Sequence, residues 1–203
     1  PIGGWERTTS SSLDSAIREI HVWRDNTAVK QTLIGTDNKL YVDNSGAWVD
    51  ITPSGFTPLS NVGVSGGYGI FTYSYGSYGT PRPASNLYNS YAFWSMGNWG
   101  QDVILTANSD GFLYYYSISA PTTAPVKITA TSGTTPTGNN AVIVTEERHV
   151  MAIAANGDPR RIAWSSAENY QDWNFASTTN TAGYLDVSSE APLLYAVKVR
   201  EGR

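Results

Sequence analysis

The chain has 203 residues, a formal net charge of −4, 15% charged and 12% aromatic residues, and no cysteine. Few charges and many aromatic side chains exclude a disordered tail, and the lack of cysteine excludes disulfides and thiolate metal sites. Nucleic-acid binders carry a basic surface, but the longest basic cluster here is Arg160-Arg161. No apolar run reaches the roughly 18 residues of a transmembrane helix.

Residues 16–53 are expected to form a four-stranded β-meander of the size of a propeller blade. A competing interpretation is a helix over residues 12–23 capped by Ser12, but the turn signal Asp25-Asn26 favours a hairpin. Apolar, β-rich runs separated by such turn residues predict strands at 17–23, 31–35, 39–42 and 47–51.

Residues 54–90 have a different character. They are rich in Gly, Tyr and Ser and show neither a helical nor a strand period. A stretch of this length between regular units is expected to be an inserted loop that carries an interaction.

Residues 91–130 repeat the order of the first unit. The stretch 33–41 aligns with 105–114, and Asp50-Ile51-Thr52 aligns with Lys127-Ile128-Thr129, which makes an internal repeat. Apolar runs between turns predict strands at 92–95, 103–106, 112–116 and 126–129, with the first turn at 98–100.

A third blade is expected over residues 140–187, and residues 193–203 are expected to open the next one. A blade cannot bury both of its faces alone and needs neighbours around a ring. The chain starts at Pro1 without a methionine and stops after a strand-like run, so we expect an all-β, partial propeller that belongs to a longer polypeptide. The strands of the third blade are expected at 142–145, 150–154, 161–165 and 183–187.

No catalytic centre is expected. Ser65 lies in a G-x-S-x-G pattern, but a nucleophile elbow needs a strand-to-helix turn, and a Gly/Tyr-rich loop follows it instead. The two histidines, His21 and His149, are isolated, so they predict ordinary surface or packed residues and no transition-metal site.

The acidic residues are expected to serve turns and solvated surfaces. Asp110-Gly111, Asp43 to Gly46 and Asn156 to Asp158 lack the ligand spacing of a calcium loop, and hairpin turns use the same residues. The pairs Glu146-Glu147 and Glu168 with Asp172 are interpreted as solvated acids. We therefore expect no metal and no cofactor.

Two groups of aromatic residues stand out. The first could form a sugar-stacking platform, although its position in or beside strands favours blade core; it comprises Trp94, Trp99, Trp164, Trp173 and residues 114–116. The second lies in the Gly/Tyr-rich loop, where rigid aromatic side chains are typical of protein interfaces. We expect this loop to contact a neighbouring subunit through Tyr68, Tyr73, Tyr75, Tyr78 and Arg82.

An ordered set of short motifs resembles tailed-bacteriophage virion proteins of the tail-nozzle and packaged-DNA-stabilisation kind. The resemblance covers nearly the whole chain, in the right order. The motifs are PIGGW at 1–5, WRDN at 23–26, IGTDNKLYV at 34–42, DITP at 50–53, YGTPRP at 78–83, WSMGNWG at 94–100, NAVIVT at 140–145 and RIAWSSAENYQDW at 161–173.

The resemblance implies a non-enzymatic ring component of a phage tail or neck, located in the virion and assembled in the host cytoplasm. Such rings retain packaged DNA and form part of its exit path. The implied partners are other copies of the chain, neighbouring tail or portal-adaptor proteins, and DNA that passes without sequence-specific binding. The alternative is a receptor- or glycan-binding propeller at the tail tip, with Trp99 in its binding surface.

Overall fold

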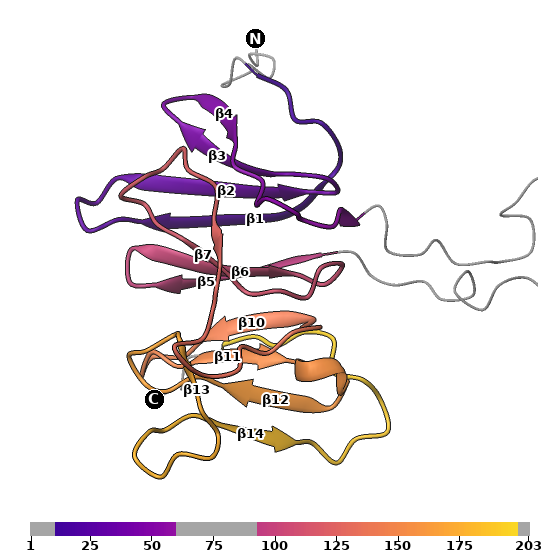
Figure 1. Ribbon diagram of the computed structural model, residues 1–203. Helices are drawn as coiled ribbons and strands as arrows, with labels where there is room; N and C mark the ends of the chain where they lie inside the picture. Colours follow the sequence, from indigo (N-terminus) through magenta and orange to yellow (C-terminus); the bar gives the residue numbers. More distant parts are fainter. Residues whose placement is uncertain (1–10, 60–92, 199–203) are drawn as a thin grey trace, which may run out of the picture.

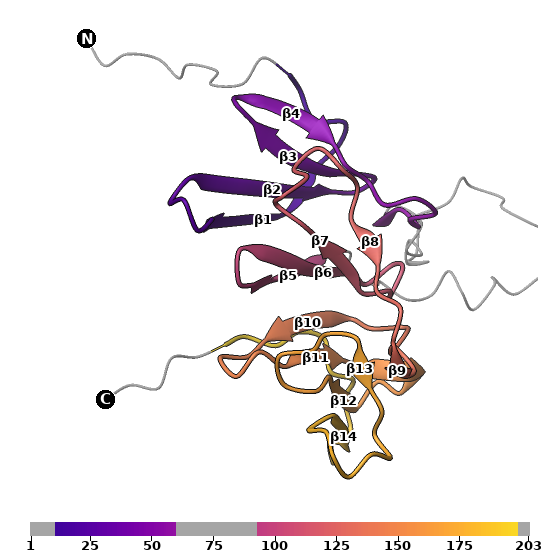
Figure 2. The same cartoon turned by 60° about the vertical axis from the view of Figure 1, so that its left-hand side comes forward.

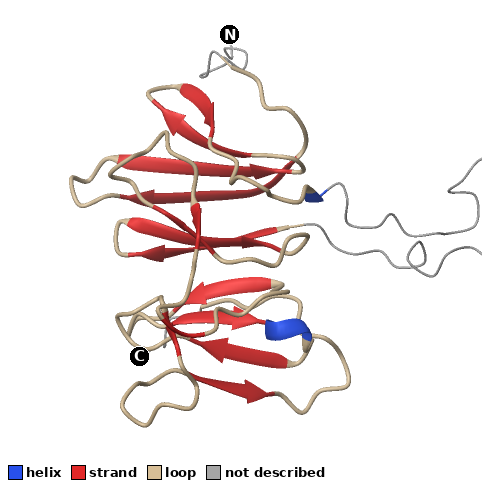
Figure 3. Ribbon diagram, in the orientation of Figure 1, coloured by secondary structure: helices blue, strands red, loops and turns tan. Residues whose placement is uncertain are grey.

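The computed structural model describes residues 11–59 and 93–198, and this part of the chain is built almost entirely from β-strands and turns (Figure 3). It contains three four-stranded antiparallel sheets, each a meander with a fixed strand order. The fold is therefore all-β, and the arrangement is consistent with a fragment of a β-propeller. We call the sheets blades 1, 2 and 3.

Blade 1 comprises β1 (Ile17–Arg24), β2 (Lys30–Thr36), β3 (Leu40–Asn44) and β4 (Ala47–Asp50). Blade 2 comprises β5 (Trp94–Trp99), β6 (Asp102–Ala107), β7 (Tyr114–Tyr116) and β8 (Val126–Lys127). Blade 3 comprises β10 (Ala141–Val144), β11 (Val150–Ile153), β12 (Arg161–Trp164) and β14 (Gly183–Asp186). The short 3₁₀ turn η3 (Ala155–Gly157) follows β11.

The three blades stack face to face in chain order, with blade 2 in the middle (Figures 1 and 2). Because side chains point alternately to the two faces of a strand, β6 contributes core side chains both to the contact with blade 1 and to the contact with blade 3. Val103 and Leu105 enter a core shared with blade 1, and Ile104 enters a core shared with blade 3. Blade 2 is thereby covered on both faces, whereas blades 1 and 3 each keep one outer face.

The first strand of each blade lies next to the first strand of the following blade, and we call β1, β5 and β10 the inner strands. The Ser95 hydroxyl on β5 donates to the Val142 carbonyl at 2.9 Å and accepts from the Val142 N–H at 3.1 Å. The Trp23 indole on β1 donates to the Gln101 carbonyl at 2.8 Å, just after β5. The inner strands are thus joined by side chains rather than by a backbone ladder.

Residues 17–24 form a strand, so the helical alternative is wrong, and Ile20 pairs with Ile34 across the hairpin. The turn placed at residues 98–100 is displaced, because β5 continues to Trp99, whose ring is buried against blade 3, and the chain reverses only at Gly100 and Gln101.

A fourth, small sheet was not anticipated. It pairs β9 (Ser132–Gly133) in parallel with β13 (Asp172–Trp173). The two segments are 40 residues apart and each has only two paired residues, so neither carries a strand period that a sequence could reveal. The pairing ties the link between blades 2 and 3 to the connection between β12 and β14.

Candidate interaction surfaces

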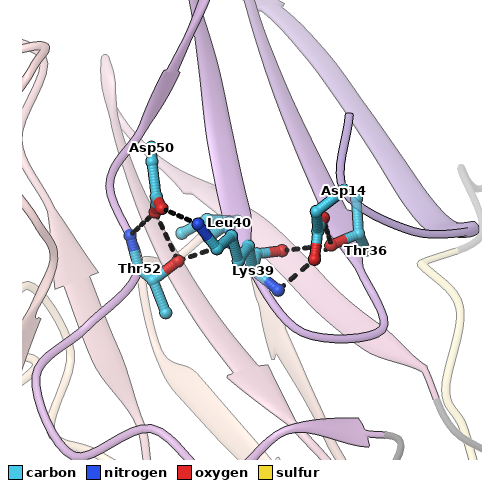
Figure 4. A network of polar contacts seen from close by, with 6 residues as sticks. All are labelled: Asp14, Thr36, Lys39, Leu40, Asp50 and Thr52. Atoms are coloured by element: carbon cyan, nitrogen blue, oxygen red, sulfur yellow. Dashed lines mark hydrogen bonds and ion pairs between the residues drawn. The ribbon is translucent and has the colours of Figure 1, made fainter. Parts of the chain in front are cut away.

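A network of polar contacts joins the β2–β3 turn of blade 1 to the end of β4 (Figure 4). The Thr36 hydroxyl donates to Asp14 at 2.8 Å, and Lys39 forms an ion pair with Asp50 at 2.7 Å. Asp50 also accepts the Thr52 N–H at 3.0 Å and the Thr52 hydroxyl at 2.6 Å. The network therefore joins the segment before β1, the β2–β3 turn and the end of β4 to one another.

These contacts shift the pKa of both carboxyl groups downward. Partial burial alone would raise the pKa of Asp50, but the hydrogen bonds from Lys39 and Thr52 outweigh it and the pKa is lowered. The pKa of Asp14 is lowered in the same way, with burial opposed by hydrogen bonds that include one from Thr36. Both side chains are therefore structural acceptors that stay ionised at neutral pH.

Blade 2 uses its tyrosines similarly. The Tyr115 and Tyr114 hydroxyls donate to Asp102 and Asp110, and the Tyr116 hydroxyl donates to the Pro121 carbonyl at 2.9 Å. Burial, aided by nearby Asp102, raises the pKa of Tyr115 and of Tyr116 to about 12. These phenols remain protonated near neutral pH, so they act as fixed hydrogen-bond donors.

A cavity of about 320 Å³ lies where the inner strands meet. At its edge the His21 imidazole donates from Nε2 to the Asn98 side-chain oxygen, joining β1 to β5. Burial lowers the pKa of His21, and the hydrogen bond to Asn98 opposes this only in part. The cavity is lined by His21, by residues 96–98 of β5, by residues 142–145 at the end of β10, and by residues 195–198.

A second hollow, of about 270 Å³ and almost wholly apolar, opens on the outer face of blade 3. Its walls include the half-buried Met151 and Trp164 side chains, which are cross-strand neighbours on β11 and β12. His149 stands at its rim, where its Nδ1 donates to the Ser165 carbonyl at 2.7 Å. The remaining walls are Thr145 and Thr181.

The aromatic residues named in the sequence analysis separate into buried and half-exposed groups. Trp94, Trp99 and Trp173 are buried in the cores between blades, as the strand positions indicated. Trp99 also lies edge-on to Tyr170 and under the Arg148 guanidinium, so it is no open stacking surface. Trp164 is the exception, because it faces the hollow on blade 3.

Other predicted residues take structural places. Glu168 forms an ion pair with Arg148 at 3.1 Å, and both carboxylate oxygens of Asp172 accept from the Asn180 side-chain amide. The two carboxyl groups therefore have different partners. The turn residues Ser45 and Asn156 have left-handed φ values of 56° and 59°, as tight turns require. Ser65 and the expected contact residues Tyr68, Tyr73, Tyr75, Tyr78 and Arg82 lie outside the described residues.

The side-chain bridges between inner strands could not be predicted from the sequence. His21 and Asn98 are 77 positions apart, and Ser95 is 47 positions from its partner Val142. A small polar residue inside an otherwise apolar inner strand was the one available signal.

No protein-family model, no curated protein and no solved structure matches this chain. Within residues 11–59 and 93–198, no helix is long and apolar enough to cross a membrane, and no three His, Cys, Asp or Glu side chains are grouped in a way that could hold a metal ion.

Proposed function

We propose that the protein is a structural, non-catalytic component of a bacteriophage tail or neck, and that it forms part of a ring that helps retain packaged DNA. The observation that carries the proposal is the ordered set of phage-like motifs distributed over a chain whose fold is a stack of repeated β-meanders. In such a stack each unit packs against its neighbours, which builds an extended scaffold.

The use of polar side chains supports a scaffold role. His21, Ser95 and Trp23 connect one inner strand to the next, and Asp50 and Asp102 hold turns in place. Each of these side chains makes a structural hydrogen bond, either between two blades or within one. An acidic chain also suits a conduit that DNA passes without binding tightly, since binding to phosphates depends on basic side chains.

The proposal is tested on purified virions of the phage that encodes the chain. An antibody against residues 93–198 and a gold label should mark the tail or neck in electron micrographs. Antibody that has first been absorbed with the purified chain supplies the control and should leave the virions unlabelled. Virions without label on the tail or neck would rule out the structural role.

The alternative is a tail-tip propeller that binds a receptor or glycan. Its original candidate, Trp99, is buried, but the half-exposed Trp164 beside the hollow on blade 3 offers an aromatic surface. Specific binding on a glycan array that is lost in Trp164→Ala would favour this alternative. Equal binding by Trp164→Ala would exclude this surface, and the absence of specific binding by the parent chain would remove the glycan-binding alternative.

A further inference from the structure

Residues 193–198 run beside β10 and in the same direction. The Leu193 N–H donates to the Pro159 carbonyl at 2.8 Å, and the Asn140 side-chain amide donates to the Leu193 carbonyl at 2.8 Å. At the other end of β10, Lys198 pairs with Glu146 at 3.4 Å. The segment therefore starts where β10 starts and ends where β10 ends.

The inner strands are related to one another in this same way. β1 and β5 run side by side in the same direction, with contacts first between His21 and Asn98 and then between Trp23 and Gln101. β5 lies beside β10 in the same manner, with the contact between Ser95 and Val142. Residues 193–198 thus occupy the place of a fourth inner strand. The shared cavity agrees, because β1, β5, β10 and residues 195–198 all line it.

The outer face of blade 3 is the surface that a sheet continuing from this strand would cover. Met151 on β11 and Trp164 on β12 are cross-strand neighbours on that face and are half-buried, and Leu185 on β14 is 58% exposed. The matching face of blade 2 behaves differently: Ile104 and Leu113 are completely buried because blade 3 lies on them. Blade 3 therefore has a docking face that none of the described residues covers.

Local packing prepares this face. A side chain at Gly183 would put its Cβ 2.7 Å from Trp164 Cζ2, so glycine lets the indole lie flat against the neighbouring strand. The indole N–H is held by the Thr181 carbonyl at 2.9 Å. Trp164 is thereby fixed as one wall of an apolar hollow of about 270 Å³, which suits the insertion of an apolar side chain.

We infer that the outer face of blade 3 is the docking surface for a fourth four-stranded blade of the same polypeptide, whose innermost strand is residues 193–198. A second copy of the chain fits less well. To place its own β1 beside β10, it would have to displace residues 193–198 and break the contacts of Leu193 and Lys198. The inference stands independently of the phage role, since any propeller needs this junction.

Thiol reactivity tests the inference without background, because the chain has no cysteine. Met151→Cys places a thiol in the hollow, and Thr122→Cys places a control thiol in the exposed turn between β7 and β8. The rate of labelling is measured in the 203-residue chain and in the product of the complete gene. Equal unfolding midpoints of each variant and its parent show that the substitutions leave the fold intact.

In the 203-residue chain we expect the thiol of Met151→Cys to react readily. In the complete gene product it should react at least about tenfold more slowly at every protein concentration, because a buried thiol reacts only from locally opened states. The Thr122→Cys rate should be unchanged. Equal Met151→Cys labelling rates in the two proteins would overturn the inference. Protection that grows with protein concentration and accompanies a doubled molecular mass would also overturn it, because a second copy of the chain would then cover the face.

Discussion

At the residue scale, Gly35 allows blade 2 to dock on blade 1. The buried Trp94 ring from blade 2 lies over this glycine, and the indole N–H donates to the Thr36 carbonyl at 2.9 Å. A Cβ at position 35 would lie 2.5 Å from Trp94 Cγ, much closer than van der Waals contact. The absence of a side chain therefore sets the distance between the two blades.

We expect Gly35→Ala to lower the free energy of unfolding by about 1–3 kcal/mol, the usual cost of overpacking a core. Urea unfolding followed by tryptophan emission measures the loss. Combining it with Trp94→Phe, which makes room, should give a loss smaller than the sum of the two single losses. Strict additivity in this double-mutant cycle would contradict a clash between the two residues.

His21 provides a pH dependence. Because burial lowers its pKa below the usual histidine value of about 6.5, the unfolded chain takes up the proton first as the pH falls. The stability associated with neutral His21 is complete above pH 6.5 and is lost as the pH falls below that value towards the folded-state pKa.

We therefore expect the melting temperature of the parent protein to fall more between pH 7.5 and pH 5 than that of His21→Gln. Glutamine retains an amide that can bond Asn98 but carries no proton equilibrium. Differential scanning calorimetry at the two pH values isolates the effect of this one residue. Parallel pH profiles for the two proteins would show that His21 does not titrate differently on folding.

At the scale of elements, the junction between β5 and β10 depends on one hydroxyl group. Ser95 is buried and satisfies both the N–H and the carbonyl of Val142. Ser95→Ala leaves these two backbone groups without this partner in a closed core. Because a buried unsatisfied group costs about 1–3 kcal/mol, we expect a loss of stability of that size.

Chemical denaturation compares Ser95→Ala with Ser54→Ala, a control at an exposed serine in the turn that follows β4. The control should stay within about 0.5 kcal/mol of the parent, as is usual for surface substitutions. Equal effects of the two substitutions would mean that the inner strands are held together by apolar packing alone.

At the scale of the whole molecule, the stack predicts an uneven distribution of stability. Blade 2 has a core on each face, while blades 1 and 3 each have an outer face with exposed apolar side chains such as Ile20 and Leu185. In a nearest-neighbour array the end units open before the middle one. The central blade should therefore be the most persistent part of the fold.

Native-state hydrogen exchange measures this gradient. We expect the slowest amide exchange on β6, at Val103 to Leu105, and faster exchange on the outermost strands β4 and β14. Exchange of all three blades with one common opening free energy would instead show that the stack unfolds as a single cooperative unit.

The sequence by itself determined the all-β class, the three meanders and most of their turns. These features depend on local chemistry: apolar runs of strand length end at residues such as Ser45-Gly46 and Asn156-Gly157, whose left-handed backbone the turns require. The burial of Trp94 and Trp173 could also be foreseen, because large aromatic side chains inside strands must face a core.

Only the tertiary structure decided how the blades meet and which surface remains open. The contacts Trp94 with Gly35, Ser95 with Val142 and His21 with Asn98 join residues that lie 47 to 77 positions apart, and nothing in either local pattern marks its partner. Trp99 and Trp164 are both tryptophans beside turns, yet one is buried and the other faces a hollow. Their difference arises because blade 3 covers the outer face of blade 2, while no described residue covers the corresponding face of blade 3.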